Sequence, residues 1–233
     1  MDGLYVMLLW YFVFLLSLVA HEASHAWAFM RLGDDTAYEE GQVTLDPVPH
    51  MRREPVGTVL VPLLTYFLNG WMMGWGSAPY NARWAYHYPR SAAWASFAGP
   101  SANLGLAVIA GIIIRTGIFF NLFYAPDSIN FDTVVATSRG GIIQPLTFLL
   151  SITFSLNVLL FIFNLLPFPP LDGSGVIPLF LRGEEAAVKY LHFISNPSFQ
   201  IFGLLMAWHI MDFIFYPVHM GFVNAMYWGL AHY

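Results

Sequence analysis

The sequence predicts an all-α polytopic membrane protein, a helical bundle that also contains one re-entrant segment and short β-strands. Apolar residues make up 58% of the 233 positions and charged residues only 10%, whereas a soluble domain is about a quarter charged. Charge is also unevenly distributed, because Asp, Glu, Lys and Arg are absent from residues 3–21, 55–82, 91–114 and 140–171. A bilayer core about 30 Å thick requires uncharged stretches of this length. These observations exclude an ordinary soluble enzyme.

Helices are expected at five places, over residues of about 4–30, 91–114, within 140–171, 184–194 and 197–216. We expect the first helix to be retained, because the N-terminus lacks the basic region and cleavage site of a signal peptide. Short strands are expected at 41–45 and 74–81, where Gly, Pro and Asn bound extended segments.

Composition also limits the chemistry. The sequence contains no cysteine, which excludes disulfides, thiolate ligands and cysteine nucleophiles. Any metal must therefore be bound by histidine and carboxylate side chains. No run of basic residues is present, so no nucleic acid partner is expected.

The first helix carries His21-Glu22-Ala23-Ser24-His25 near its end. Residues four apart share one helix face, so both imidazoles can bind one zinc ion, and Glu22 can act as general base on a water molecule. This short motif also occurs by chance in unrelated proteins. A His-Glu-His cluster inside an apolar helix is costly, however, and such residues in a spanning segment are usually functional.

A catalytic zinc site needs a third protein ligand. Asp172 is the leading candidate, because it follows the longest uncharged stretch directly after prolines that must end a helix. Asp212, within the last span, is the second candidate, although a carboxylate near a helix end would explain it as well. His50 is the isolated histidine that deserves most notice.

Four blocks of sequence occur in the order typical of one family: 21–27 (HEASHAW), 41–58, 97–103 (FAGPSAN) and 164–173. With them, the chain resembles the site-2 proteases, and among these the small bacterial branch without a PDZ or CBS domain. The resemblance implies one zinc ion per chain held by His21, His25 and Asp172, with Glu22 activating water. It also implies that Asn164, and with less force Asn157, contacts the substrate backbone or the oxyanion.

The residues themselves allow these roles. Asn157 and Asn164 lie two helical turns apart and share a face, so their amides could bind a substrate strand or the tetrahedral intermediate. An interhelical amide contact is the alternative for both. Asn103 follows small residues that permit close helix approach, and we expect it to be a structural support first and a substrate contact second. The chain departs from the family pattern in four places. Ser77 replaces a common lysine, Asp46 a common asparagine, and Arg52-Arg53 a shorter, less basic linker. After Asp172, the residues Gly173-Ser174-Gly175 lack the basic residue that often follows Gly-Ser.

Matching depths in the membrane predicts a topology. The first helix must cross toward the site, the helix at 91–114 must leave it, and the helix within 140–171 must return. Residues 56–75 must then start and end on one side, as a re-entrant hairpin that Pro62, Asn69, Gly70 and Gly74 would suit. Seven Lys and Arg residues then lie on the side of the site and two on the other, which favours a cytoplasmic site.

We therefore expect a single intramembrane metalloprotease domain over residues 1–233, with a catalytic core at about 4–181. Its partners would be the lipid bilayer and a transmembrane protein substrate, in the bacterial cytoplasmic membrane. A catalytically silent zinc-binding scaffold or a transporter is the alternative. A membrane di-iron oxygenase is disfavoured because it needs several histidine-rich motifs, and only one is present.

Overall fold

Four long helices dominate the computed structural model, which describes residues 3–230 and 233. They are α1 (Gly3–Leu32), α6 (Pro89–Phe119), α7 (Ile143–Asn164) and α10 (Pro197–Met226). All four are long and apolar enough to cross a membrane. The expected helical bundle is therefore present, although the outermost residues of the expected domain, 1–2 and 231–232, lie outside this description.

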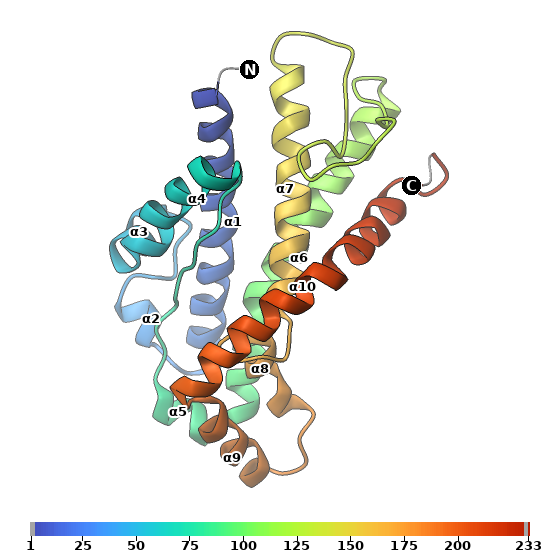
Figure 1. Ribbon diagram of the computed structural model, residues 1–233. Helices are drawn as coiled ribbons and strands as arrows, with labels where there is room; N and C mark the ends of the chain where they lie inside the picture. Colours follow the sequence, from blue (N-terminus) through green and yellow to red (C-terminus); the bar gives the residue numbers. More distant parts are fainter. Residues whose placement is uncertain (1–2, 231–232) are drawn as a thin grey trace.

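The direction of the long helices brings distant parts of the sequence to one end (Figure 1). The C-terminal end of α1, the N-terminal end of α6 and the C-terminal end of α7 all lie in the lower half of the view. Helix α10 starts at that end and leans diagonally across α7. A core of small and branched side chains from α6, α7 and α10, such as Ala107, Val158 and Ala207, joins these three helices. The alternating directions match the expected topology.

Helix α1 ends where its sequence indicates. Gly33 has φ +105°, a conformation that glycine adopts without a Cβ penalty. The N–H of Asp34 donates to the carbonyl of Phe29 at 2.9 Å, which satisfies one of the free carbonyls of the last turn. The Asp34 carboxylate then accepts from the N–H of Asn81 at 2.7 Å. The end of α1 is thereby tied to a segment 47 residues downstream.

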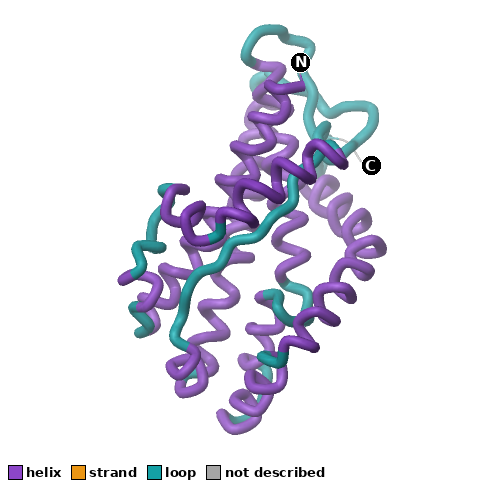
Figure 2. The backbone as a smooth tube through the Cα atoms, turned by 60° about the vertical axis from the view of Figure 1, so that its left-hand side comes forward, coloured by secondary structure: helices purple, strands orange, loops and turns teal. Residues whose placement is uncertain are grey.

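Residues 56–81 form a hairpin with one helical and one extended limb. A π-helical turn (Val56–Leu60) leads into α4 (Val61–Asn69), and Gly70, with φ +78°, ends the helix. The chain then returns along α1 as a long extended segment, seen as the teal tube crossing the molecule in Figure 2. Two hydrogen bonds join the limbs, from Trp75 N to Gly57 O at 3.2 Å and from Met73 N to Thr65 Oγ1 at 3.0 Å.

The expected β-strands are wrong as secondary structure, because no strand occurs within residues 3–230. Residues 41–45 form turns and bends, and residues 74–81 are extended but have no neighbouring strand to pair with. The turn at 41–45 precedes α3 (Pro47–Arg53). Asp46 caps the N-terminus of α3, because its carboxylate accepts a hydrogen bond from the N–H of Val48 at 2.9 Å. Asparagine and aspartate cap helices equally well, which explains why Asp46 can replace the common asparagine.

The remaining helices are short and lie at the end of the molecule where α1 and α7 end and α6 begins (Figure 1). They are α2 (Thr36–Glu39), α5 (Ala82–His87), α8 (Asp172–Val176), a 3-10 turn (Ile177–Leu179) and α9 (Glu184–Ile194). The last span is longer than expected, because α10 continues through Pro217 to Met226 instead of ending near residue 216.

Candidate metal centre and active site

Helix α1 presents His21, Glu22 and His25 on its buried face, and each residue is only 6% exposed. The four-residue spacing of the histidines places their rings edge to face, with the two Nε2 atoms 3.0 Å apart. Both imidazoles thus point to one position beside the helix.

Asp172 completes this group from the first residue of α8. Its Oδ2 atom lies 3.0 Å from His21 Nε2 and 3.2 Å from His25 Nε2. These three residues form the group of potential metal ligands found within the described chain. A carboxylate is the form of Asp172 that would bind a cation.

Hydrogen bonds on the far side of each ring determine the histidine tautomers. His25 Nδ1 lies 2.8 Å from the Ala95 carbonyl, which can only accept, so Nδ1 carries the proton. His21 Nδ1 lies 2.6 Å from Asn103 Oδ1. The Asn103 amide is oriented by its own donation to the Ser17 carbonyl at 3.2 Å. In neutral histidine with Nδ1 protonated, Nε2 holds a free lone pair, so both Nε2 atoms are acceptors.

The residues fit a bound cation. Three acceptor atoms meet at about hydrogen-bonding distance, and within the described chain Asp172 Oδ2 is buried without a hydrogen-bond donor. Such a cluster of lone pairs is unfavourable unless a positive charge lies among them. Two imidazoles and one carboxylate are a ligand set that zinc accepts in catalytic sites. Gly99 leaves the space next to the two Nε2 atoms free of a side chain, because a Cβ on this residue would overlap the Nε2 atoms of both histidines.

Asn103 and Asn157 form a buried amide network behind His21. Asn103 Nδ2 donates to Asn157 Oδ1 at 2.8 Å, and Asn157 Nδ2 donates to Ser17 Oγ and to the Thr153 carbonyl, both at 2.8 Å. Both asparagines are fully buried. Asn103 has the contacts that a supporting residue needs. The position of Asn157 corresponds to the interhelical alternative instead of a substrate contact, because its amide is occupied and inaccessible.

Asn164 differs from Asn157 although they share the sequence pattern. It is the last residue of α7 and is partly exposed. Its side chain forms no hydrogen bond with any described residue, so the amide is available to a ligand.

Glu22 lies against the extended segment of the hairpin. A Cβ on Gly76 would come within 2.7 Å of Glu22 Cγ and 2.9 Å of its Oε1, so only glycine lets the segment approach this closely. Beyond Gly76, the segment is anchored by Ser77, which donates to Glu54 at 2.6 Å and accepts from Arg53 Nε at 3.1 Å. The main chain is hydrogen bonded at Trp75 and again at Asn81. Between these two residues, the main chain of residues 76–80 forms no hydrogen bond within the described chain.

Asp172 also lines a cavity. A cavity of about 280 Å³ lies between α5, α6, α9 and the loop before α8, and its walls include Asp172, Ser96 and Ser174. Tyr190 of α9 donates to the Ser174 carbonyl at 3.0 Å beside it. Burial raises the pKa of Tyr190 to about 12, so this phenol stays a neutral donor. The cavity thus borders Asp172, one of the three residues that supply the acceptor atoms.

The family model for peptidase family M50 matches residues 9–204 in one stretch. The chain belongs to this family. The family is that of the site-2 proteases, so the resemblance in the sequence is confirmed. This M50 member has four helices that are long and apolar enough to cross a membrane.

Two relatives agree with this assignment. The chain is 36% identical over 165 residues to "Putative zinc metalloprotease YwhC" of Bacillus subtilis, a match that covers 70% of this chain and 64% of YwhC. It is 32% identical over 170 residues to "Putative zinc metalloprotease Rip2" of Mycobacterium tuberculosis, covering 73% of this chain and 56% of Rip2. The chain thus spans less than two thirds of these relatives. No solved structure matches it.

Two other sequence candidates lie apart from the three acceptor atoms. His50 is buried, and its Nε2 is 3.0 Å from the Thr44 carbonyl, so it stabilises the turn before α3. Asp212 is outside the metal-ligand group, and it lies midway along α10 instead of near a helix end. Sequence reasoning missed the roles of Ser17, Gly76 and Gly99. Glycines inside apolar segments were the available signal for the last two, since such glycines mark close approach.

Proposed function

We propose that this M50 protein is a zinc-dependent intramembrane endopeptidase that hydrolyses peptide bonds in or near transmembrane segments of membrane protein substrates. The observation that carries the proposal is the convergence of three acceptor atoms from His21, His25 and Asp172, with the buried Glu22 on the same helix as both histidines. A metalloprotease of this class needs three protein ligands and a general base.

The reaction assigns one role to each residue. One zinc ion, held by His21, His25 and Asp172, would lower the pKa of a water molecule toward about 7 and polarise the scissile carbonyl. Glu22 takes a proton from the attacking water and delivers it to the leaving nitrogen. A bond forms between the water oxygen and the carbonyl carbon, the C–N bond breaks, and a carboxylate and an amine result. Asn164 donates to the oxyanion or to the substrate backbone.

Asn103 and Asn157 act behind the ligands in this proposal. Asn103 keeps His21 in the tautomer that leaves Nε2 free, and residues of this kind orient metal ligands in other sites. Asn157 orients Asn103 through the bond at 2.8 Å. Asn157 therefore supports the metal ligands and does not contact the substrate in this proposal.

The extended segment presents the substrate. A transmembrane helix hides its peptide bonds in its own hydrogen bonds, so a substrate must unwind locally before hydrolysis. The unpaired main chain of residues 76–80 offers donors and acceptors to an unwound stretch, as an edge strand does in β-augmentation. Glu22 lies against Gly76 in this segment, so the added strand would pass the general base.

The hairpin is proposed to be re-entrant, with both ends on the side of the site. Tyr66 of α4 reaches the Gly3 carbonyl at 3.5 Å, so the tip of the hairpin lies near the start of α1. We assign the site to the cytoplasmic side of a bacterial cytoplasmic membrane, because seven of the nine Lys and Arg residues then lie on that side. A re-entrant hairpin keeps both of its ends on the side of the site, so cysteines at the exposed residues Arg52 and Arg83 that reacted from opposite sides of the membrane would contradict this topology.

Glu22→Gln is the variant that tests the catalytic role. With the purified full chain in proteoliposomes and a single-span reporter protein, we expect cleavage to fall by a factor of about 100 to 10,000 or more. Zinc content should stay at one ion per chain, because Glu22 is not among the three converging ligands. Unchanged cleavage by this variant would refute the role of Glu22. Bound zinc without cleavage by the wild type would favour the silent scaffold or transporter.

A further inference from the structure

Asp212 is an unpaired carboxylate in the middle of a spanning helix. Asp212 is the one charged residue of α10, it is exposed, and it forms no hydrogen bond or ion pair with any described residue. A charge at membrane depth is expensive, and such residues usually face a protein interior or cavity where they have a function. The proposed metal site does not use Asp212, so its place in α10 needs another explanation.

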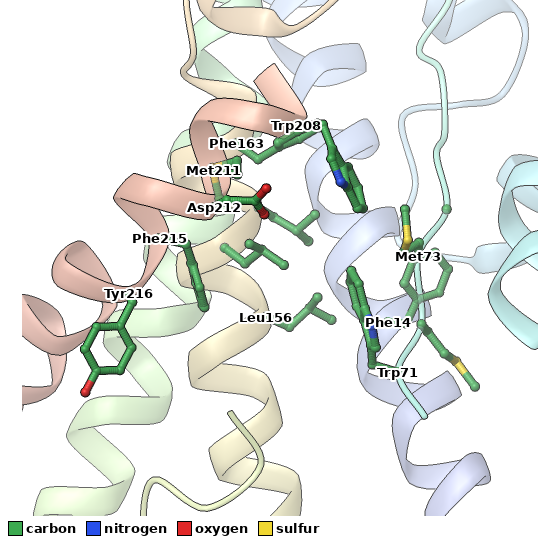
Figure 3. A pocket seen from close by; sticks show the side chains of 14 residues that line it. Phe14, Trp71, Met73, Leu156, Phe163, Trp208, Met211, Asp212, Phe215 and Tyr216 are labelled. Atoms are coloured by element: carbon green, nitrogen blue, oxygen red, sulfur yellow. The ribbon is translucent and has the colours of Figure 1, made fainter. Parts of the chain in front are cut away.

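The carboxylate of Asp212 faces a pocket of about 380 Å³ with otherwise apolar walls (Figure 3). The pocket separates α10 and α7 from α1 and the first residues of the extended segment. Its walls consist mainly of aromatic, leucine and methionine side chains, among them Phe14, Trp71, Met73, Leu156, Trp208 and Phe215. Met residues and aromatic rings adapt to varied apolar groups, but within this lining Asp212 alone carries a charge.

The pocket and the proposed catalytic site lie along one continuous segment. Met73 and Gly74 line the pocket, and Gly76 lies against Glu22. An extended chain advances about 3.3 Å per residue, so Gly76 lies about 7 Å from Gly74 and about 10 Å from Met73. A substrate strand paired with this segment would pass Glu22 with one residue and reach the pocket about three to five residues away.

We propose that the pocket binds a lysine or arginine side chain of the substrate, about three to five residues from the scissile bond, with Asp212 as its ion-pair partner. This inference rests on the proposed function and names a substrate class for it. The long aliphatic stem of either side chain packs on apolar walls while its charged end reaches a carboxylate. Trp71 and Trp208 can add cation–π attraction. A neutral occupant leaves Asp212 desolvated without a partner, which is unfavourable.

The first experiment measures selectivity of cleavage. Single-span reporters carry either lysine or methionine at successive positions on each side of the cleavage site, and the full chain acts on them in proteoliposomes. For wild type we expect one position at which lysine is cleaved about tenfold faster than methionine, equivalent to about 1.4 kcal/mol. Asp212→Asn should reduce that ratio to about one, while Asp127→Asn, the same change in an exposed loop, should keep it.

The second experiment measures binding without cleavage. The inactive Glu22→Gln chain should bind the lysine reporter about tenfold more tightly than the methionine reporter, and adding Asp212→Asn should remove the difference. Asp212→Lys should reverse the preference in favour of glutamate at that position. Equal ratios in wild type and Asp212→Asn, in cleavage or binding, would overturn the inference. If the wild type bound the lysine reporter selectively but cleaved nothing, the proposed function would fail and the pocket assignment would stand.

Discussion

Buried polar groups are fully hydrogen bonded in the interface of α1, α6 and α7, whereas the pocket beside α10 contains a carboxylate without a partner in the described chain. In the interface, Asn103 and Asn157 are fully buried and every amide group is hydrogen bonded, as is Ser17. In the pocket, Asp212 has no partner within the described chain and lies among apolar walls. The two helices also differ in burial. In an 18-residue apolar stretch of each helix, 56% of the α7 residues are buried inside the protein, but only 17% of the α10 residues are.

This difference separates two tasks. Metal ligands must be held within a fraction of an ångström, and a network with all its hydrogen bonds made supplies such rigidity. A surface that receives varied segments instead needs adaptable walls and few constraints, with one polar group to select among them. The following variants test whether the two regions are separable in this way.

Gly99→Ala should have the largest effect, because it puts a methyl group where the two histidine Nε2 atoms point. We expect zinc affinity to fall by more than the roughly 10- to 100-fold typical of changes behind a ligand, and cleavage to be lost. Metal analysis after dialysis measures the first effect. Gly105→Ala is the matched control, because a Cβ there meets nothing within 4 Å. Full zinc content in Gly99→Ala would contradict the proposed metal position.

Gly76→Ala should reduce cleavage by up to about 100-fold, since displacing a catalytic group by about 1 Å can cost that much. The new Cβ would lie 2.9 Å from Glu22 Oε1, so the carboxylate must move. Zinc content should be unchanged, which distinguishes this variant from Gly99→Ala. Gly221→Ala, at an open position, should cleave like the wild type. Normal cleavage by Gly76→Ala would show that the segment does not position Glu22.

Asn103→Ala should weaken zinc binding by about 10- to 100-fold, as expected for loss of a hydrogen bond to a ligating histidine. It also leaves Asn157 and the Ser17 carbonyl without a donor, so we expect about 1–3 kcal/mol less stability. Zinc titration and thermal unfolding measure the two effects. Asn130→Ala, in an exposed loop, serves as the control. Loss of stability without loss of zinc affinity would assign Asn103 to packing alone.

Ser77→Ala should have the smallest effect, because its hydrogen bonds to Glu54 and Arg53 lie in a partly exposed network. We expect KM to rise about two- to fivefold with little change in kcat, since one such bond contributes about 0.5–1.5 kcal/mol and solvent reduces it. Ser198→Ala is an exposed control. A drop in kcat with constant KM would show that Ser77 acts on catalysis instead of on substrate capture.

Prediction from sequence succeeded where the cause is local. Three of the four long uncharged stretches, 3–21, 91–114 and 140–171, contain the long helices that were expected there. Four-residue spacing placed His21 and His25 on one face of α1 whatever surrounded them. Prediction from sequence failed where a structure depends on a neighbouring segment that is distant in the sequence. Residues 74–81 are extended as expected, but a strand needs a neighbour, and none is present within residues 3–230. Asn157 and Asn164 share a helical face, yet a neighbouring helix covers one and leaves the other partly open.

The sequence by itself determined the helical membrane class and the histidine pair, because hydropathy and helical periodicity act over short distances. For the third ligand it offered Asp172 first and Asp212 second. Only the tertiary structure decided that Asp172 and not Asp212 meets the histidines, that Asn103 orients His21, and that Gly76 lies on Glu22. These contacts join residues from 54 to more than 100 positions apart, and their geometry depends on how whole helices pack. No pattern within a single segment contains that information.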